Sequence, residues 1–156
     1  MPGALDAVAH SDVALCLMHM QGTPLTMQNR PSYSSVSDEV ISFLKHRAGE
    51  MIDDGVLSER LIVDPGFGFG KTLEHNLELL AATDQICALG YPVLIGLSRK
   101  SMFAQLLGRD VDERLFGSIA GATLGASLGA SILRVHDVQE TMDAVKVVNA
   151  LRPYRV

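Results

Sequence analysis

The sequence predicts one α/β folding unit with a parallel sheet, and three observations lead to this. Short apolar runs of strand length alternate with longer segments in which apolar residues keep helical spacing, in the order βαβαβαβα. The strand-like runs are continuously apolar, which is typical of parallel strands buried on both faces and joined by right-handed crossovers. The 156 residues, 47% of them hydrophobic, suffice for a single packed domain over residues 1–156.

The expected strands are apolar runs too short to form core helices. They cover residues 13–18, 61–63, 92–96 and 131–135. Residues 21–35, rich in Thr, Pro, Asn and Ser, are expected to form a long loop after the first strand.

Helices are expected between the strands and after the last one. The first begins at the acidic stretch Ser37-Asp38-Glu39 and stops at Gly55. The next three cover residues 73–89, 100–107 and 112–128, and the last is capped by Asp137 and ends near Arg152.

Residues 116–133 carry no charge and place Gly117, Gly121, Gly125 and Gly129 four apart, a spacing found where membrane helices pack together. Gly, Ala and Ser give little free energy of membrane insertion, so we expect a buried helix and no membrane association. Each interior Gly costs about 1 kcal/mol of helix propensity. Close approach to a sheet or to another subunit would offset that cost.

Several classes of function are disfavoured by composition. A net charge of −5 with scattered basic residues argues against nucleic-acid binding. Cys16 and Cys87 lie in apolar runs and are expected to be buried and reduced, and no signal-peptide pattern opens the chain, so we expect a cytoplasmic protein. His10, His46 and His75 are expected to be solvated, and no metal site is expected within this chain.

Polar or glycine-rich loops follow all four strands, and in a parallel α/β protein such loops meet at the C-terminal edge of the sheet. In chain order they contain His19-Met20-Gln21-Gly22, Asp64-Pro65-Gly66-Phe67-Gly68-Phe69-Gly70-Lys71, Ser98-Arg99-Lys100-Ser101 and Arg134-Val135-His136-Asp137. We therefore expect one polar wall, centred on Asp64, Lys100, Arg134 and His136.

Cationic side chains end two of the strands. Arg134 and His136 are two residues apart, so in a strand they point to the same side, and together they suit a phosphate or pyrophosphate. The alternative is a surface ion-pair partner followed by a histidine that only begins a helix. Of Arg99 and Lys100 at the neighbouring strand end, one charge can be taken up by an acidic neighbour.

Asp64 ends an apolar strand, where a carboxylate serves either a ligand or nearby backbone amides. It is suited to accept two N–H donors from an aminopyrimidine-like ring edge. Phe67 and Phe69 alternate with glycines, so one ring can face a flat ligand. The alternative is that both rings only pack the loop.

The same loop nearly matches a nucleotide-binding P-loop, because Gly70-Lys71-Thr72 supplies the end of that motif. The glycine that the motif requires five positions earlier is Pro65, which removes an N–H from the phosphate cradle. We therefore expect no ATP or GTP site here.

Taken together, the four loops resemble dihydropteroate synthase in motif order and spacing, over essentially the whole chain. The motifs that carry the resemblance are Leu17-Met18-His19-Met20-Gln21-Gly22, the stretch from Asp64 to Lys71, Gly96-Leu97-Ser98-Arg99-Lys100-Ser101 and Arg134-Val135-His136-Asp137. That family is a (β/α)8 barrel of folate biosynthesis, which joins 6-hydroxymethyl-7,8-dihydropterin pyrophosphate to p-aminobenzoate. The resemblance implies half of such a TIM-type barrel, its last four β/α units.

The resemblance also implies which residues bind the pterin. Asp64 would hold the amino-pyrimidine edge of the ring and Lys100 would reach the pterin. Met20 and Gly96 would line its pocket.

The remaining implied roles concern the leaving group and the second substrate. Arg134 and His136 would bind the pyrophosphate, while Ser98 and Phe69 would contact p-aminobenzoate, where sulfonamides compete. Lys100, Arg134 and His136 would be the catalytic groups, acting by charge stabilisation and positioning, without a covalent protein nucleophile.

The chain departs from the family in length, because a complete barrel needs eight strands and usually about 200 or more residues. Met1-Pro2-Gly3-Ala4-Leu5 resembles the helical segment before the fifth strand, so the N-terminal half is expected to be missing. Mg²⁺ is implied as a cofactor whose protein ligand lies in that half. The glycine-spaced helix and the last helix resemble the family's dimer-forming side.

Three hypotheses follow. The first is a synthase, as a homodimer or with its missing half. The second is a catalytically incompetent half-barrel that needs a partner chain, and the third is a phosphate-binding half-barrel with another substrate. We expect no measurable synthase turnover from this chain by itself.

Overall fold

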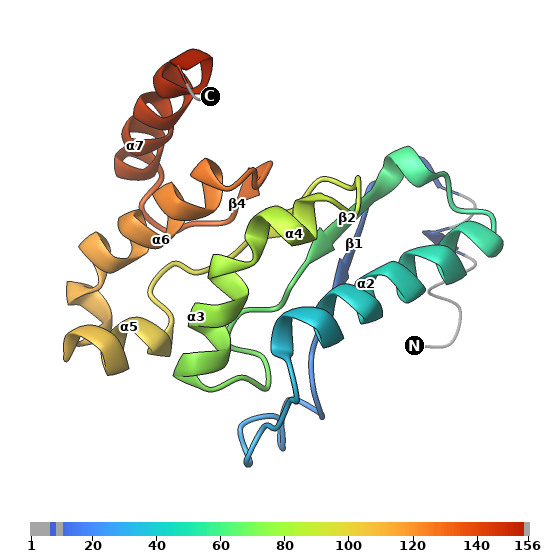
Figure 1. Cartoon of the computed structure of the whole chain (residues 1–156), viewed down its shortest axis with the longest axis horizontal. Helices are drawn as coiled ribbons and strands as arrows, with labels where there is room; N and C mark the ends of the chain where they lie inside the picture. The colour runs from blue at the N-terminus through green and yellow to red at the C-terminus, as the bar shows by residue number, and fades with distance from the viewer. Residues whose placement is uncertain (1–6, 9–10, 155–156) are drawn as a thin grey trace.

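The computed structural model describes residues 7–8 and 11–154 and shows an α/β chain (Figure 1). The strands are β1 (Leu15–Met18), β2 (Leu61–Asp64), β3 (Leu94–Ile95) and β4 (Ile132–Leu133). The helices are α2 (Val36–Asp53), α3 (Leu73–Ala81), α4 (Thr83–Cys87), α5 (Ser101–Leu107), α6 (Leu115–Ser127) and α7 (Val138–Leu151), with 3₁₀ turns η1 (Ser58–Arg60), η2 (Val111–Glu113) and η3 (Arg152–Tyr154). The predicted alternation is confirmed, while residues 1–5 and His10 lie outside the described residues.

All pairings between the named strands are parallel, as predicted. β1 pairs with β2 along its whole length, which places Met18 opposite Asp64. β3 pairs with β4, which places Ile95 opposite Leu133. A single parallel bridge joins β2 to Val93, directly before β3. The C-terminal ends of paired strands therefore lie side by side, and the loops that follow them are neighbours.

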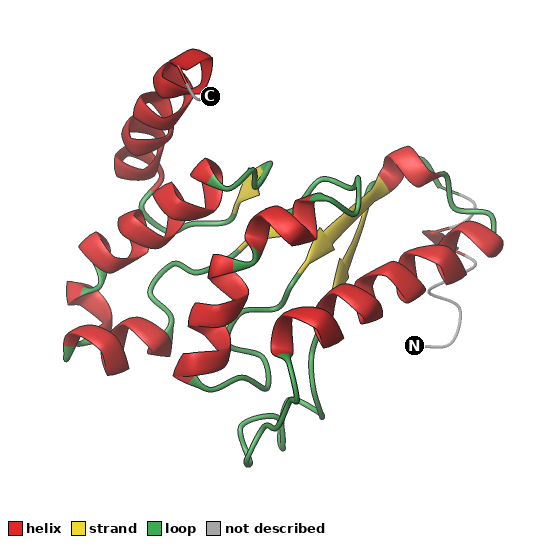
Figure 2. Cartoon of the chain, viewed as in Figure 1, coloured by secondary structure: helices red, strands yellow, loops and turns green. Residues whose placement is uncertain are grey.

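The main core lies where helices pack against the strands (Figure 2), and it includes Leu44 of α2, Leu79 of α3 and Ile95 of β3. The expectation that every strand is buried on both faces is wrong. In β1, Leu17 is buried whereas Cys16 is exposed, because successive side chains of a strand point to opposite faces and helices cover only one of them.

The two cysteines were expected to be buried, and that prediction is also wrong. Cys16 is exposed and Cys87 is half-buried, although both are free thiols, as expected. Each thiol is nevertheless partly withdrawn from water, and this burial raises the pKa of both.

Three helix boundaries differ from the prediction. The first helix begins one residue earlier, at Val36, with Ser35 as its N-cap and the Ser35 hydroxyl accepting from the amide of Asp38. The predicted helix over residues 73–89 is broken at Ala82, where the hydroxyl of Thr83 donates to the carbonyl of Leu80 at 2.8 Å and competes with the helical backbone. The glycine-spaced helix begins at Leu115, because residues 111–113 form the separate turn η2.

Glycines on one side of α6 allow it to approach its neighbours closely. A Cβ at Gly121 would lie 2.9 Å from Cζ of Phe103 in α5, and one at Gly125 would lie 2.8 Å from Cδ1 of Ile95 in β3. The expected offset for the low helix propensity of glycine is therefore present within the chain, as packing on the sheet and on α5. None of the helices in the described part of the chain is long and apolar enough to cross a bilayer.

Substituting Gly121 by Ala should destabilise the fold, although alanine is the better helix former. The gain in propensity is about 1 kcal/mol, whereas crowding the buried Phe103 and Leu97 side chains should cost about 1–3 kcal/mol. The matched control is Gly49→Ala in α2, where an added Cβ meets nothing within 4 Å and should stabilise. Urea denaturation measures both. A Gly121→Ala chain as stable as Gly49→Ala would contradict the packing argument.

Candidate active site

The carboxylate of Asp64 lies at the C-terminal end of β2 and is almost fully buried, with 2% of the residue exposed. Its Oδ1 accepts a hydrogen bond from the backbone N–H of Gly66 at 2.8 Å, and its Oδ2 lies 3.5 Å from Nη2 of Arg134. Burial raises the pKa of Asp64, and the Gly66 N–H, Arg134, Lys100 and Lys71 act in the opposite direction. The predicted proximity of Asp64 and Arg134 is thus observed.

Lys100 brings a second cation to the same place from the loop after β3. Its ammonium donates to the carbonyl of Phe67 and lies 4.6 Å from the centre of the Phe69 ring, within the range of a cation–π contact. Burial lowers the pKa of Lys100 to about 8, partly offset by the nearby Asp64 carboxylate. Phe67 is fully buried in the core, so of the two aromatic side chains in this loop it is Phe69 that flanks the site.

Arg134 and Gly96 meet at the ends of β4 and β3. A Cβ at position 96 would lie 2.8 Å from Nη2 of Arg134, so a glycine there leaves room for the guanidinium. The side chain of Arg134 is 57% exposed. Its donors therefore remain accessible to a ligand while one of them contacts Asp64.

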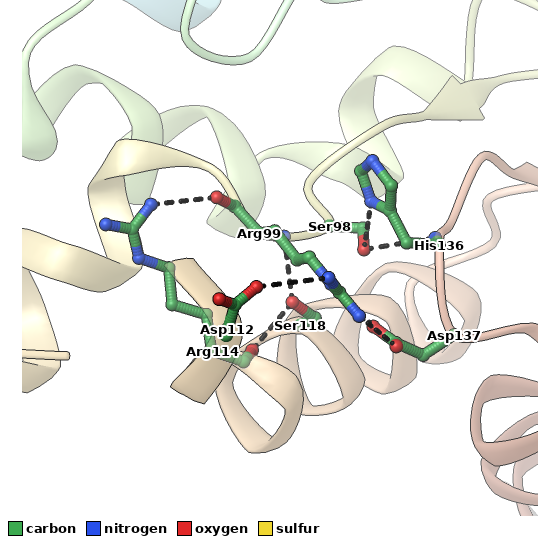
Figure 3. Close-up of polar contacts among 7 residues, drawn as sticks. All are labelled: Ser98, Arg99, Asp112, Arg114, Ser118, His136 and Asp137. Carbon is green, nitrogen blue, oxygen red and sulfur yellow. Dashed lines mark hydrogen bonds and ion pairs between the residues drawn. The ribbon is translucent and has the colours of Figure 1, made fainter. Parts of the chain in front are cut away.

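His136 is exposed and is held by Ser98 (Figure 3). The hydroxyl of Ser98 lies 2.9 Å from Nδ1 of His136 and accepts from the His136 backbone N–H at 3.2 Å.

A small cavity of about 160 Å³ lies between the loops that follow β3 and β4. Its lining residues are Gly96, Ser98, Lys100, Arg134, Val135 and His136. Five of the eight predicted site residues therefore share one cavity, Asp64 and Phe69 contact its cations, and Met20 lies half-buried outside that lining.

Lys71 is buried close enough to Asp64 for its charge to oppose the burial that raises the pKa of that carboxyl, a position that the sequence did not reveal. Its ammonium is 3.0 Å from Nδ1 of His19 and donates to the carbonyls of Gly66 at 2.9 Å and of Phe69 at 3.2 Å. Burial lowers the pKa of Lys71 to about 8, and burial together with Lys71 lowers the pKa of His19 to about 4. The ammonium of Lys71 thus points inward onto the carbonyls of its own loop.

Polar side chains from other parts of the chain also bind the backbone of residues 65–71, here called the glycine loop. The carbonyl oxygen of the buried Asn76 accepts from the N–H of Gly68 at 2.8 Å, and the hydroxyl of Tyr33 donates to the carbonyl of Gly70 at 2.8 Å. The expectation that His75 is solvated is wrong. Its side chain is half-buried, and its Nδ1 accepts from the N–H of Thr72 in a capping box at the start of α3. Only the spacing of Thr72 and His75 could have indicated this cap, because the other contacts depend on the path of the loop.

A metal site of the usual protein kind is absent from the described residues: they hold no group of three or more His, Cys, Asp or Glu side chains that could bind an ion. His46 is exposed, as expected, and lies 3.5 Å from Glu50 on the next turn of α2. The polar wall is thus an arrangement of cations around one carboxylate, which suits an anionic organic ligand with N–H donors.

Comparison with known proteins agrees with this chemistry. A family model described as "Pterin binding enzyme" matches residues 1–136. The dihydropteroate synthase of Haemophilus influenzae is 48% identical over 149 residues, covering 96% of this chain and 54% of that protein. The dihydropteroate synthase of Escherichia coli strain K12 is also 48% identical, with 96% and 53% covered.

Solved structures give the same relationship. A Yersinia pestis dihydropteroate synthase in a sulfonamide drug complex superposes with a TM-score of 0.96 at 44% identity, covering 99% of this chain and 56% of that one. Dihydropteroate synthase from Xanthomonas albilineans in complex with 7,8-dihydropteroate gives 0.90 at 45% identity, covering 97% and 55%. The chain spans about half the length of the curated relatives that it matches.

Lys71 is expected to make a contribution to the free energy of unfolding that rises with pH between about 8 and 10.5, because burial lowers its pKa from 10.5 to about 8. In that interval the unfolded chain holds more protons on this side chain than the folded chain does, so raising the pH favours folding. Urea denaturation at several pH values measures the slope. Lys71→Met should reduce the slope and leave the contribution of Lys100, whose pKa burial also lowers to about 8, whereas Lys45→Met, at an exposed position of α2, should leave the slope unchanged. A slope unchanged in Lys71→Met would rule out this titration.

Proposed function

The chain belongs to the family of pterin binding enzymes, and from that premise we propose that it supplies one wall of a cytoplasmic dihydropteroate synthase site. The proposed reaction joins 6-hydroxymethyl-7,8-dihydropterin pyrophosphate to p-aminobenzoate and releases 7,8-dihydropteroate and pyrophosphate. The observation that carries the proposal is that Asp64, Lys100 and Arg134 lie together, although they come from the C-terminal ends of three different strands and the loops after them.

The pterin is assigned to the carboxylate side of this wall. Asp64 offers acceptor oxygens to the 2-amino and ring N–H groups, and the Gly66 N–H fixes its orientation. Lys100 would donate to an acceptor of the pterin ring, for which its contact with the Phe67 carbonyl already sets the position. Gly96 is buried beside Arg134 and Met20 lies half-buried in the loop after β1, so both are proposed to border the ring.

The pyrophosphate is assigned to the cavity between Arg134 and His136. When the bond between the exocyclic methylene carbon and the pyrophosphate oxygen breaks, its electron pair leaves with the pyrophosphate. Arg134, His136 and Lys100 would stabilise the resulting charge, and the p-aminobenzoate nitrogen then forms the new bond to the methylene carbon and loses a proton. Ser98 and Phe69 are proposed to position p-aminobenzoate.

Mg²⁺ is proposed as a companion of the pyrophosphate, but the described residues do not form a site for it. Its protein ligand would have to come from the part of the relatives that this chain does not match. The roles proposed for Asp64, Lys100, Arg134 and His136 do not depend on a metal.

We also propose that the two strand pairs belong to one half of a (β/α)8 barrel, with its strands in the order β1-β2-β3-β4. It is supported by the parallel bridge that connects the two strand pairs. Exposed apolar side chains on α6 and α7, among them Phe116 at 81% and Val147 at 62%, support a second copy or a complementary chain as partner. Light scattering of the purified chain would give its oligomeric state.

Binding of 6-hydroxymethyl-7,8-dihydropterin pyrophosphate should weaken by about tenfold or more in Arg134→Ala and in Asp64→Asn, since each removes a hydrogen bond made by a charged group. Isothermal titration calorimetry measures the dissociation constant. The control is Arg47→Ala, which removes an exposed cation of α2 paired with Glu50. Binding that both site variants leave unchanged would defeat the proposal.

Turnover separates the two forms of the hypothesis. Dihydropteroate formation by the chain alone, lost in Lys100→Ala, would mark a self-sufficient enzyme. Formation only after adding a polypeptide that covers the unmatched half of a relative would mark a half that needs its partner.

A further inference from the structure

Arg99 lies between two proposed ligand-binding residues, Ser98 and Lys100, yet it faces away from the cavity that both of them line. Its backbone has φ of 57°, a left-handed conformation that is unfavourable for a residue with a side chain. Both of its peptide groups are secured (Figure 3). The N–H of Arg99 donates to the hydroxyl of Ser118 at 2.9 Å, and its carbonyl accepts from Nη1 of Arg114 at 2.9 Å.

The guanidinium of Arg99 binds the carboxylate of Asp137 through two contacts. Nη2 lies 2.6 Å from Oδ1 and Nε lies 3.2 Å from Oδ2, a bidentate arrangement. Only 34% of the Arg99 side chain and 16% of the Asp137 side chain are exposed. A second carboxylate, that of Asp112, lies 3.8 Å from Nη1 but is 90% exposed, so its contribution is small.

This ion pair joins two loops that belong to different strands. Arg99 directly follows Ser98 in the loop after β3, and Asp137 directly follows His136 in the loop after β4. The pair therefore spans the same gap as the contact between Ser98 and His136, one residue further along each loop. Asp137 is the N-cap residue of α7, but its side chain makes no capping hydrogen bond, so its carboxylate is committed to Arg99.

We propose that Arg99 and Asp137 form a positioning clamp that holds the imidazole of His136 against Ser98 and so shapes the anion-binding cavity. The inference rests on the proposed function in assigning pyrophosphate to that cavity. Arg99 is not a ligand of the pyrophosphate, because its donors face Asp137 and Asp112. It acts through the loop, and Ser118 and Arg114 hold the strained backbone that directs its side chain toward α7.

A clamp and a simple charge effect predict opposite signs for one substitution. Asp137→Asn removes a negative charge close to a proposed anion site, so electrostatics alone would tighten binding of an anion. Loss of the clamp would loosen His136 and weaken binding instead. Asp112→Asn is the matched control, because it removes the same charge from the surroundings of Arg99 but breaks only an exposed contact.

The first measurement is the dissociation constant of inorganic pyrophosphate, by calorimetry at fixed pH and salt. Asp137→Asn should weaken binding about tenfold, and Asp112→Asn should leave it unchanged or slightly tighter. Arg99→Lys keeps the charge but not the two-pronged geometry, and it should weaken binding as Asp137→Asn does. Circular dichroism and the thermal midpoint confirm that each variant is folded. Binding by Asp137→Asn as tight as in the parent chain, or tighter, would overturn the clamp.

The second measurement requires no ligand. In the chain labelled with ¹⁵N-histidine, the ring nitrogen signals of His136, identified by their loss in His136→Gln, report the hydrogen bond at Nδ1. These signals should move in Asp137→Asn and in Arg99→Lys and stay in place in Asp112→Asn. If the parent chain fails to bind pyrophosphate, the proposed function fails, but the ring signals still decide the clamp. Signals that stay in place in both clamp variants would refute it.

Discussion

Burial of the Asp64 carboxylate at the end of β2 is the constraint on which the site depends. Removing a carboxylate from water is costly unless charges and hydrogen bonds compensate it. The compensation comes from the Gly66 N–H, Arg134, Lys100 and Lys71, and burial in turn lowers the pKa of both lysines to about 8. Three cations around one carboxylate leave an excess of positive charge, so the arrangement that stabilises the buried acid also favours an anionic ligand beside it.

Close contact between the glycine loop and the end of β1 determines where these cations point. A Cβ at Gly66 would lie 1.8 Å from the carbonyl oxygen of His19, and one at Gly70 would lie 2.6 Å from that of Gln21. Both glycines have positive φ, so the loop curls tightly enough for Lys71 to donate to carbonyls of its own loop. The lysine of the Gly70-Lys71-Thr72 stretch is therefore buried under its own loop, where its charge opposes the rise in the pKa of Asp64 that burial causes.

The placement of the site was predictable from sequence because parallel strands bring their C-terminal ends to one edge. Asp64, Ser98, Lys100, Arg134 and His136 meet there as expected. What sequence did not yield depends on backbone dihedral angles and on what covers each face. The inward turn of Lys71 follows from its glycine neighbours, the break at Ala82 from one threonine hydroxyl, and the exposure of Cys16 from helices that cover only one face. Periodicity contains none of that information.

The two arginines of this edge show how partners, rather than residue type, decide a role. Arg99 is held by two short contacts to Asp137, with a third of its side chain exposed. Arg134 touches Asp64 at 3.5 Å and is more than half exposed. Exchanging the single long contact of Arg134 for ligand oxygens costs little, whereas releasing Arg99 would leave the partly buried Asp137 carboxylate without its partner. The space that Gly96 leaves beside Arg134 adds to this freedom. One arginine therefore has donors available for an anion, and the other joins the loop after β3 to the loop after β4.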